Sequence, residues 1–317
     1  MEHRNVGRSG LRLSIIGLGA WLNVSTTSTE GEAILRRALD RGVTFLDTAN
    51  VYGLGEAETA WGKWLAHVPR ESFVLASKCF FPMGHGPFQR GLSRKHIRAS
   101  IDASLTRLRT DYLDLYQCHR YDPESPVDEV VRTMNDLISA GKIHHWGTSQ
   151  WPAEALREAW AFAKRTGREG PISDQPCHNL LDRTIESEVQ PACAELDMAI
   201  LPYSPLAQGV LTGKYLNGPL PMESRASHPD HRGFVKRFLE PEAVALTRSL
   251  ADLAKRSGFA LSTLSLRWLL SRPQVASVIV GASRVAQLDE SLLAAEAKIP
   301  SDVLAEATRL STPGATL

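Results

Sequence analysis

The sequence predicts an α/β protein, a (β/α)8 TIM barrel that the whole chain, 1–317, forms as a single domain. Short apolar runs alternate with longer segments of helical periodicity along nearly the whole chain. Strict alternation of this kind is typical of parallel strands joined by right-handed crossovers. Eight such runs can be counted, and 317 residues suffice for one barrel with insertions. An open, doubly wound sheet would give the same alternation, so the count favours the barrel and leaves that sheet as the alternative.

The predicted strands are short runs of apolar and β-branched residues. They are expected at residues 13–17, 43–47, 73–78, 112–119, 143–148, 172–175, 198–203 and 275–280. The segment that precedes them, 5–13, places Ser9-Gly10 between two short alternating runs, which is typical of a β-hairpin. We expect this N-terminal hairpin to cap the bottom of the barrel.

Segments with helical periodicity follow most of these strands. Ser93 is a candidate N-cap, Gly141 is a typical C-terminal stop, and Pro152 is a favoured first helical residue. The expected helices span 56–66, 93–108, 127–140, 152–166, 186–196, 241–256, 262–271 and 284–297. A long irregular loop, about 216–238, follows the seventh strand. Loops of this length inside a compact domain are usually functional.

Composition and charge exclude several classes of function. Lys and Arg number 36 against 35 Asp and Glu, so the formal net charge of +1 indicates no nucleic acid partner. No apolar run approaches the roughly 18 residues of a membrane helix, and the N-terminus lacks the apolar stretch of a signal peptide. The four cysteines, Cys79, Cys118, Cys177 and Cys193, have no metal-ligand spacing and are typical of free thiols. We therefore expect a cytoplasmic protein with no membrane partner and no metal.

Polar residues stand at the ends of seven of the predicted strands. They are Asp47, Lys78, His119, Ser149, Gln175, Tyr203 with Ser204, and Gly281 with Ser283. In a barrel these positions meet on the C-terminal rim, where barrel enzymes build their active sites. Each residue alone could be an ordinary turn residue, but their recurrence at strand after strand favours a site.

Four residues near this rim, Asp47, Tyr52, Lys78 and His119, have the chemistry to reduce a carbonyl group. A tyrosine, whose free pKa is about 10, donates a proton poorly at neutral pH unless its phenolate is stabilised. The Lys78 ammonium could stabilise it, and Asp47 could hold Lys78 by a charge-assisted bond. His119 could orient a carbonyl oxygen towards Tyr52. Such a site suits protonation of an alkoxide while a cofactor supplies hydride.

The motifs around these residues resemble the signature blocks of the aldo-keto reductase family. They are GVTFLDTANVYG at 42–53, ASK at 76–78 and DLYQCH at 114–119. The resemblance covers nearly the whole chain. It implies a (β/α)8 barrel, a metal-free tetrad of Asp47, Tyr52, Lys78 and His119 with Tyr52 as general acid, and NADP(H) as cofactor. It also implies a small-molecule carbonyl substrate, an aldehyde or ketone reduced to an alcohol.

Further motifs are similar to one subgroup of that family, the beta subunits of voltage-gated potassium channels and their bacterial relatives. They include WGTS at 146–149, SPLA at 204–207, GKY at 213–215, SRAS at 224–227 and GAS at 281–283. The channel subunits have Asn at the position of His119 and carry an N-terminal extension that does not precede Met1 here. Both differences favour an enzyme. The relatives form tetramers or octamers, which leaves a homo-oligomer open.

The resemblance also implies which residues contact NADPH along the rim. They are Trp21, Asp47, Ser149, Gln175, Tyr203, Ser204, Pro205, Leu206, Gln208, Lys214, Arg225, Gly281, Ser283, Gln287, Glu290 and Ser291. Ser149 and Gln175 are expected at the nicotinamide carboxamide. Cationic and hydroxyl groups such as Lys214, Arg225 and Ser283 suit a 2′-phosphate, which is why NADP is expected in preference to NAD. Ser291 replaces an Asn of the channel subunits, which weakens one adenine contact.

Two alternatives to a reductase remain open at this point. The first is an NADPH-binding regulatory or redox-reporting subunit with little turnover. The second is a phosphate-sugar lyase or isomerase on the same barrel, which would need no nicotinamide. Among the remaining residues, Phe80 and Phe81 lie in a rim loop and, with Trp21, are candidates for walls of a substrate pocket. Asp114 alternates away from His119 and is expected to pair with a cation in the barrel wall.

Overall fold

A computed structural model describes residues 1–21, 27–217, 220–222 and 224–312. Its centre is a parallel eight-stranded sheet in the order β10-β3-β4-β5-β6-β7-β8-β9. The strands are β3 (Ile16–Gly19), β4 (Phe45–Asp47), β5 (Val74–Cys79), β6 (Leu113–Cys118), β7 (Ile143–Thr148), β8 (Ser173–Asp174), β9 (Ala199–Ile200) and β10 (Val278–Val280). A parallel bridge between Ile200 and Val275 joins β9 to the segment that leads into β10. The sheet therefore closes, which confirms the predicted (β/α)8 barrel over the open sheet.

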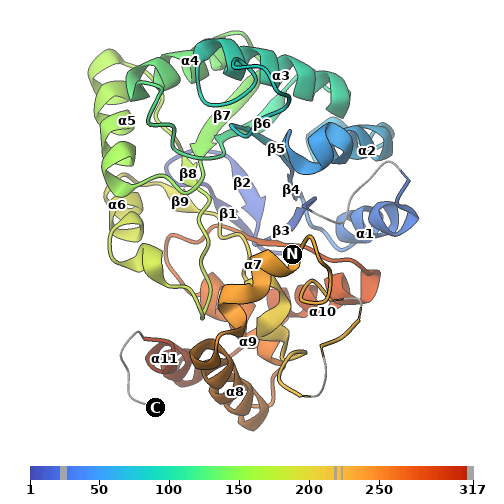
Figure 1. Ribbon diagram of the computed structural model, residues 1–317. Helices are drawn as coiled ribbons and strands as arrows, with labels where there is room; N and C mark the ends of the chain where they lie inside the picture. Colours follow the sequence, from blue (N-terminus) through green and yellow to red (C-terminus); the bar gives the residue numbers. More distant parts are fainter. Residues whose placement is uncertain (22–26, 218–219, 223, 313–317) are drawn as a thin grey trace.

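Helices alternate with these strands and form a ring outside the barrel (Figure 1). They are α1 (Thr29–Asp40), α2 (Glu56–Trp64), α3 (Arg94–Leu108), α4 (Val127–Ser139), α5 (Ala153–Thr166), α6 (Val189–Glu195), α8 (Pro241–Arg256), α9 (Leu261–Leu270), α10 (Val285–Glu296) and α11 (Ser301–Leu310). Among the described residues, none of the helices combines the length and apolar character needed to cross a membrane.

The N-terminal hairpin is formed by β1 (His3–Asn5) and β2 (Arg12–Ser14), which pair antiparallel. Val6 in its turn and Leu13 on β2 are fully buried and belong to the same apolar cluster as Phe45 inside the barrel. Burial of the hairpin side chains among the inward-facing residues places it as a plug at one end of the barrel. The predicted cap is confirmed.

The first barrel strand was predicted two to three residues too early. The expected run 13–17 joins the end of β2 to the start of β3 without a break in hydrophobicity, so periodicity could not separate the two strands. Ser14 marks the break: its hydroxyl donates to the Ile16 carbonyl at 2.7 Å and accepts from the backbone N–H groups of Thr44 and Phe45 at 3.0 and 3.2 Å. The serine replaces ladder hydrogen bonds that the chain loses as it turns from hairpin to barrel.

The helix predictions need three corrections. Helices α1 and α11 were not predicted, although Ser28 caps α1 by accepting from the Gly31 N–H at 2.8 Å. The predicted helix 186–196 divides into a 3₁₀ turn, Thr184–Glu186, and the shorter α6, whose third residue is Pro191. Pro152 is the N-cap of α5 and not its first helical residue.

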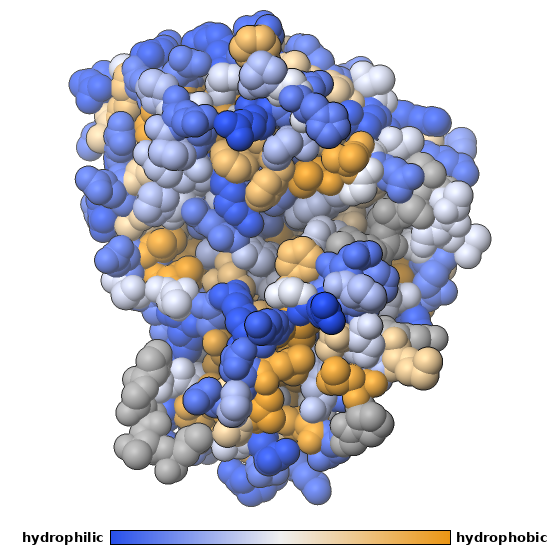
Figure 2. Space-filling view, viewed as in Figure 1, coloured by the Kyte–Doolittle hydropathy of each residue, from blue (hydrophilic) through white to orange (hydrophobic). Residues whose placement is uncertain are grey.

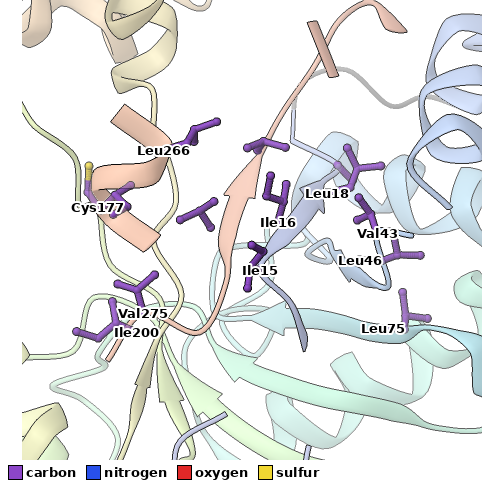
Figure 3. Close-up of a cluster of buried hydrophobic side chains, with 14 of the residues drawn as sticks. Ile15, Ile16, Leu18, Val43, Leu46, Leu75, Cys177, Ile200, Leu266 and Val275 are labelled. Atoms are coloured by element: carbon purple, nitrogen blue, oxygen red, sulfur yellow. The ribbon is translucent and has the colours of Figure 1, made fainter. Parts of the chain in front are cut away.

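Alternation along β4 determines what faces the barrel interior. Phe45 and Asp47 point inward, and Leu46 between them points outward towards the helices. Leu46 is fully buried in the outer apolar layer with Leu18 of β3 and Leu75 of β5, as Figure 3 shows. Period-two geometry at the strand end therefore delivers the Asp47 carboxylate to the interior of the barrel.

The segment after β9 is less irregular than predicted. It contains the 3₁₀ turns η4 (Ala207–Thr212) and η5 (Lys236–Leu239), with the short helix α7 (Arg232–Val235) between them. Within the predicted loop 216–238, residues 218–219 and 223 lie outside the described residues. Figure 1 shows α7 in the lower half of the view, between the barrel strands and α9, and Figure 2 shows hydrophilic side chains over the same area.

Candidate active site

Asp47, Tyr52, Lys78 and His119 lie together at the carboxyl ends of β4, β5 and β6. The Lys78 ammonium donates to Asp47 Oδ2 at 2.5 Å and to the Thr48 carbonyl at 2.8 Å. It also donates to the Tyr52 hydroxyl at 3.3 Å. The rings of Tyr52 and His119 meet edge to face, with centroids 5.8 Å apart. The structure thus makes neighbours of four residues that are up to 72 positions apart in the sequence (119 − 47).

Asp47 is held by amides as well as by Lys78. Gln117 of β6 and Gln175 after β8 each donate a side-chain N–H to Asp47 Oδ1 at 3.0 Å. Gln175 also donates to Gln117 Oε1 at 3.1 Å. Both carboxylate oxygens are therefore satisfied, which a buried ion pair needs if it is not to destabilise the fold. Gln117 was not predicted, although it lies two residues before His119 and alternation places both on the same face.

Two pKa values decide which groups carry protons at neutral pH. Burial raises the pKa of Tyr52, and the Lys78 ammonium opposes it only in part, so the pKa lies above the ordinary value of 10.0. Lys78 lowers the pKa, as expected of a nearby ammonium, but desolvation outweighs its charge. Burial, with the cations Lys78 and Arg120, holds the pKa of His119 well below 6.5. Tyr52 is therefore a protonated phenol and His119 a neutral imidazole.

The backbone that carries Tyr52 is bonded to β5 through a buried carboxylate. Glu58 of α2 is fully buried and accepts from the Ser77 hydroxyl at 2.5 Å and from Arg107 Nε of α3 at 2.7 Å. Ser77 directly precedes Lys78. Between Tyr52 and α2 the chain turns through Gly53, Leu54 and Gly55, all at positive φ. This network joins α2, α3 and β5, and it fixes the position of the tyrosine relative to the lysine.

The four residues stand beside a large cleft at the carboxyl ends of the strands, with a volume of about 2030 Å³. Asp47, Tyr52 and His119 line it, and Lys78 lies behind them, fully buried. Every residue predicted to contact the cofactor also lines this cleft. Phe81 lines it as well, whereas Phe80 is not among the lining residues and packs edge-on against Phe81 at 5.3 Å.

A strained turn forms the middle of the cleft. Ser204, Ala207 and Gln208 have φ values of 52°, 46° and 58°, a left-handed conformation that non-glycine residues rarely adopt. At Gly209, φ is 92° and a Cβ atom would lie 2.9 Å from Lys214 Nζ, so a side chain there would displace the lysine. Successive turns of this kind form concavities lined by backbone N–H groups that bind anions. Lys214 adds a cation, so this part of the cleft fits a pyrophosphate.

Side chains from the long segment after β9 extend the same wall. Arg225 donates to the Gln208 carboxamide, and Gln208 donates to the Ser204 hydroxyl. The Arg225 guanidinium also lies over the Trp21 ring, 5.3 Å from its centroid. Trp21 meets Phe234 of α7 edge to face at 4.7 Å. The cation expected near the adenine end thus bridges the strained turn and the aromatic wall.

The far end of the cleft is formed by α10 and the turn before it. Ser283 donates both its backbone N–H and its hydroxyl to Gln287 Oε1, at 2.9 and 3.0 Å. Glu290 accepts from the Ser262 hydroxyl at 2.7 Å. Ser291 donates to the carbonyl of Gln287 at 2.9 Å, so its hydroxyl proton is used within its own helix. The weaker adenine contact expected of Ser291 stays a prediction.

The end of the cleft where the nicotinamide is predicted to bind has donors and acceptors from three strand ends. The Ser149 hydroxyl donates to the carbonyl of Gln175 at 2.7 Å. Tyr203 accepts a hydrogen bond from Gln150, whose φ of 55° turns it towards the tyrosine. Gln150 was not predicted, and only its place next to Ser149 could have suggested it. Away from the cleft, Asp114 pairs with Arg70 at 2.6 Å, as expected for the barrel wall.

Comparison with known proteins agrees with this fold and site. Residues 15–312 match the model of the Aldo/keto reductase family. The chain therefore belongs to the aldo/keto reductase family, as its motifs predicted. Enzymes of this family are oxidoreductases that generally use NADP(H).

Its relatives fall in the predicted subgroup. The chain is similar to the "Probable voltage-gated potassium channel subunit beta" of Oryza sativa subsp. japonica, with 40% identity over 298 residues, 93% of this chain and 91% of the relative. A protein of the same name from Arabidopsis thaliana is 38% identical over 301 residues, 93% and 92% of the two chains. A "Putative voltage-gated potassium channel subunit beta" of Schizosaccharomyces pombe (strain 972 / ATCC 24843) is 36% identical over 303 residues, 92% and 88% of the two chains.

Proposed function

We propose that this protein is an NADP(H)-dependent oxidoreductase of the carbonyl reductase type, which reduces aldehydes or ketones to alcohols with Tyr52 as general acid. The observation that carries the proposal is the contact of one buried ammonium, that of Lys78, with both Asp47 and the Tyr52 hydroxyl at the wall of the cleft. A phenol bonded to a fixed cation is a proton donor whose product anion is already stabilised.

NADP(H) fits the residues that line the cleft. Ser149 and Gln175 offer hydroxyl and amide partners for the carboxamide, and Tyr203 offers a ring for stacking. The strained turn 204–209 with Lys214 would hold the pyrophosphate, and Arg225 with the Ser283–Gln287 pair would hold the 2′-phosphate. When bound there, the cofactor supplies the hydride that the reduction needs.

The chain's own residues account for the proton and the orientation. Tyr52 gives its phenol proton to the carbonyl oxygen of the substrate, and Lys78 stabilises the phenolate that remains. Asp47 keeps Lys78 in place, since both of its oxygens are bonded. His119 is neutral, so it can donate one N–H to the carbonyl oxygen without competing as an acid. The geometry of the four residues supports this division of roles.

A second candidate is a regulatory subunit that binds NADPH and turns over little. The names of the relatives favour it, because they describe subunits of potassium channels. His119 and the fully bonded Tyr52–Lys78–Asp47 group favour turnover. We also propose that the protein works in the cytoplasm on a small molecule and not on nucleic acid, and that a homo-oligomer is compatible with its function.

The proposal is tested by measuring cofactor binding and aldehyde reduction together. NADPH, titrated by fluorescence, should bind at least about tenfold more tightly than NADH, because a phosphate paired with cations adds charge-assisted hydrogen bonds. Arg225→Gln should weaken NADPH binding and leave NADH binding unchanged, whereas Lys214→Gln should weaken the binding of both, because both cofactors have the pyrophosphate. Purified protein should oxidise NADPH in the presence of 4-nitrobenzaldehyde. Tight NADPH binding without turnover of any aldehyde would favour the regulatory subunit, and no binding at all would favour the lyase or isomerase.

A further inference from the structure

An arginine lies at the tetrad end of the cleft and takes no part in the proposed chemistry. Arg120 directly follows His119, is half-buried and lines the cleft. Its guanidinium lies over the ring of Phe81, 5.1 Å from the centroid, and Phe81 meets the His119 ring edge to face at 4.9 Å. Arg120 is close enough to Tyr52 for its charge to lower the pKa of the phenol. The cation thus lies beside the place where a carbonyl would react.

Within the described part of the chain Arg120 forms no ion pair with a carboxylate, although the buried Asp174 is near enough for the charge of Arg120 to oppose the rise of its pKa. The one hydrogen bond of Arg120 there runs from Nη1 to the carbonyl of His119, the residue before it, at 2.5 Å. A guanidinium has five N–H donors, so most of them remain for another partner. Other cations in this part of the cleft are paired: Lys78 with Asp47, and Arg237 with Asp182 at 2.8 Å.

The other acidic residues that line the cleft do not pair with Arg120. Apart from Asp47, they are Glu56, Glu240 and Glu290. All three are exposed, and within the described ranges none forms an ion pair with Arg120. A half-buried guanidinium that forms no direct ion pair keeps its charge and N–H donors for an anionic ligand. The phosphate-binding residues proposed for NADP(H), Lys214 and those of α10, belong to other parts of the cleft, so the cofactor does not account for Arg120.

We propose that Arg120 binds a carboxylate of the substrate, so that the preferred substrates are aldehydes or ketones that also carry a carboxylate group. This inference rests on the proposed reductase function. A planar guanidinium forms two parallel hydrogen bonds to a carboxylate, a fit that a lysine cannot reproduce. Phe81, under the guanidinium, offers an apolar face to the body of the substrate.

The carboxylate keeps its charge throughout the reaction. Hydride adds to the carbonyl carbon and the proton of Tyr52 to its oxygen, while NADPH becomes NADP⁺ and the phenolate regains a proton from solvent. The product is a hydroxy acid.

A matched pair of substrates tests the proposal. The carboxylate 4-carboxybenzaldehyde and its neutral methyl ester, methyl 4-formylbenzoate, have the same reactive group and nearly the same shape, and 3-carboxybenzaldehyde varies the position of the charge. The better of the two acids should exceed the ester in kcat/KM by about 10- to 100-fold, the range of a charge-assisted pair. Arg120→Gln should reduce this ratio to about one, and Arg120→Lys should restore part of it.

The ratio of the two substrates is the decisive readout, because general damage to the site would lower both rates alike. Arg237→Gln is the matched control: this arginine lines the same cleft but is paired, so its loss should leave the ratio unchanged. A wild-type ratio near one, or a preference that survives in Arg120→Gln, overturns the proposal while the reductase function stands, provided that the ester is reduced.

Binding separates this proposal from the function on which it rests. The acid 4-carbamoylbenzoate has the carboxylate but an amide in place of the aldehyde, so it can be titrated by calorimetry into NADPH-saturated protein without turnover. It should bind wild type about tenfold or more tightly than Arg120→Gln. Equal affinity would refute the assignment even if no aldehyde were ever reduced.

Discussion

Lys78 is the residue on which the site depends. It has three N–H donors, and the structure gives them three oxygens: Asp47 Oδ2, the Thr48 carbonyl and the Tyr52 hydroxyl. Burial lowers the pKa of Lys78, but Asp47 and Tyr52 more than compensate, so the net pKa is raised. Lys78 stays charged, and two strong acceptors direct its remaining N–H to the phenol. The Tyr52 hydroxyl is therefore held in place by a hydrogen bond that the buried Lys78 ammonium donates.

Replacing Lys78 by Met should destabilise the fold strongly. Loss of one partner leaves the Asp47 carboxylate buried with only its amide donors, and removal of one member of a buried pair typically costs about 3–5 kcal/mol. Urea unfolding without cofactor measures this loss. The double variant Lys78→Met/Asp47→Asn should recover part of it, because neither charge remains. A single variant as stable as wild type would contradict the description of this pair.

At the scale of elements, β7 and β8 are joined by a polar contact between their ends. Thr148 and Asp174 are register partners, and the Thr148 hydroxyl donates to Asp174 Oδ1 at 2.7 Å. Asp174 Oδ2 is buried and has no hydrogen-bond partner among the described residues. Burial raises the pKa of Asp174 from 3.8 to about 6, although the bond from Thr148 opposes the shift. The carboxyl is therefore a neutral link in acid and a buried charge at neutral pH.

The raised pKa of Asp174 makes the stability of the fold fall as the pH rises. The folded state holds the proton of Asp174 more tightly than the unfolded chain does. Its contribution to the free energy of unfolding is therefore largest below pH 3.8 and is lost as the pH rises to about 6. Asn cannot ionise, so the free energy of unfolding of Asp174→Asn should rise relative to that of wild type across this pH range, by about 3 kcal/mol in all. Urea unfolding at the two ends of the range measures the rise.

A control on another aspartate excludes a general effect of charge. Asp252 is exposed on α8, so Asp252→Asn changes the net charge by the same amount without touching the barrel. Its stability relative to wild type should not grow with pH in the same way. A difference between Asp174→Asn and wild type that is constant from acid to neutral pH would show that the buried carboxyl does not behave as described.

Elements that bury one apolar face could be predicted from the sequence, and those defined by distant contacts could not. Buried parallel strands are apolar runs, so their polar ends, Asp47 and His119 among them, were visible in the sequence. The break at Ser14 was not, because it depends on hydrogen bonds to Thr44 and Phe45, about 30 residues away. Helix α1 is different: Ser28 and two acidic residues in its first turn were a readable start signal that was missed.

At the scale of the molecule, closure of the barrel brings the two ends of the cleft together. The bridge from Ile200 to Val275 sets the strand end that carries the strained turn next to the one that carries Ser283. Alternation of strands and helices predicts eight units but not this closure, which requires pairing between residues 75 positions apart (275 − 200). The roles of Gln117 and Arg120 were missed for a related reason, because each depends on neighbours from other strands or loops.

The central claim is that Tyr52 donates the proton in a site that Lys78, Asp47 and His119 prepare. Tyr52→Phe removes one hydroxyl and keeps the ring, so NADPH affinity should stay within about twofold of wild type, since no charge-assisted contact is lost. Tyr116→Phe is the matched control, because this fully buried tyrosine of β6 is not among the residues that line the cleft.

The decisive measurement is kcat/KM for 4-nitrobenzaldehyde with saturating NADPH in Tyr52→Phe, Tyr116→Phe and wild type. Loss of a general acid should lower kcat/KM in Tyr52→Phe by about 10²- to 10⁴-fold, with Tyr116→Phe close to wild type. Turnover by Tyr52→Phe above about a tenth of wild type would contradict the assignment of the general acid.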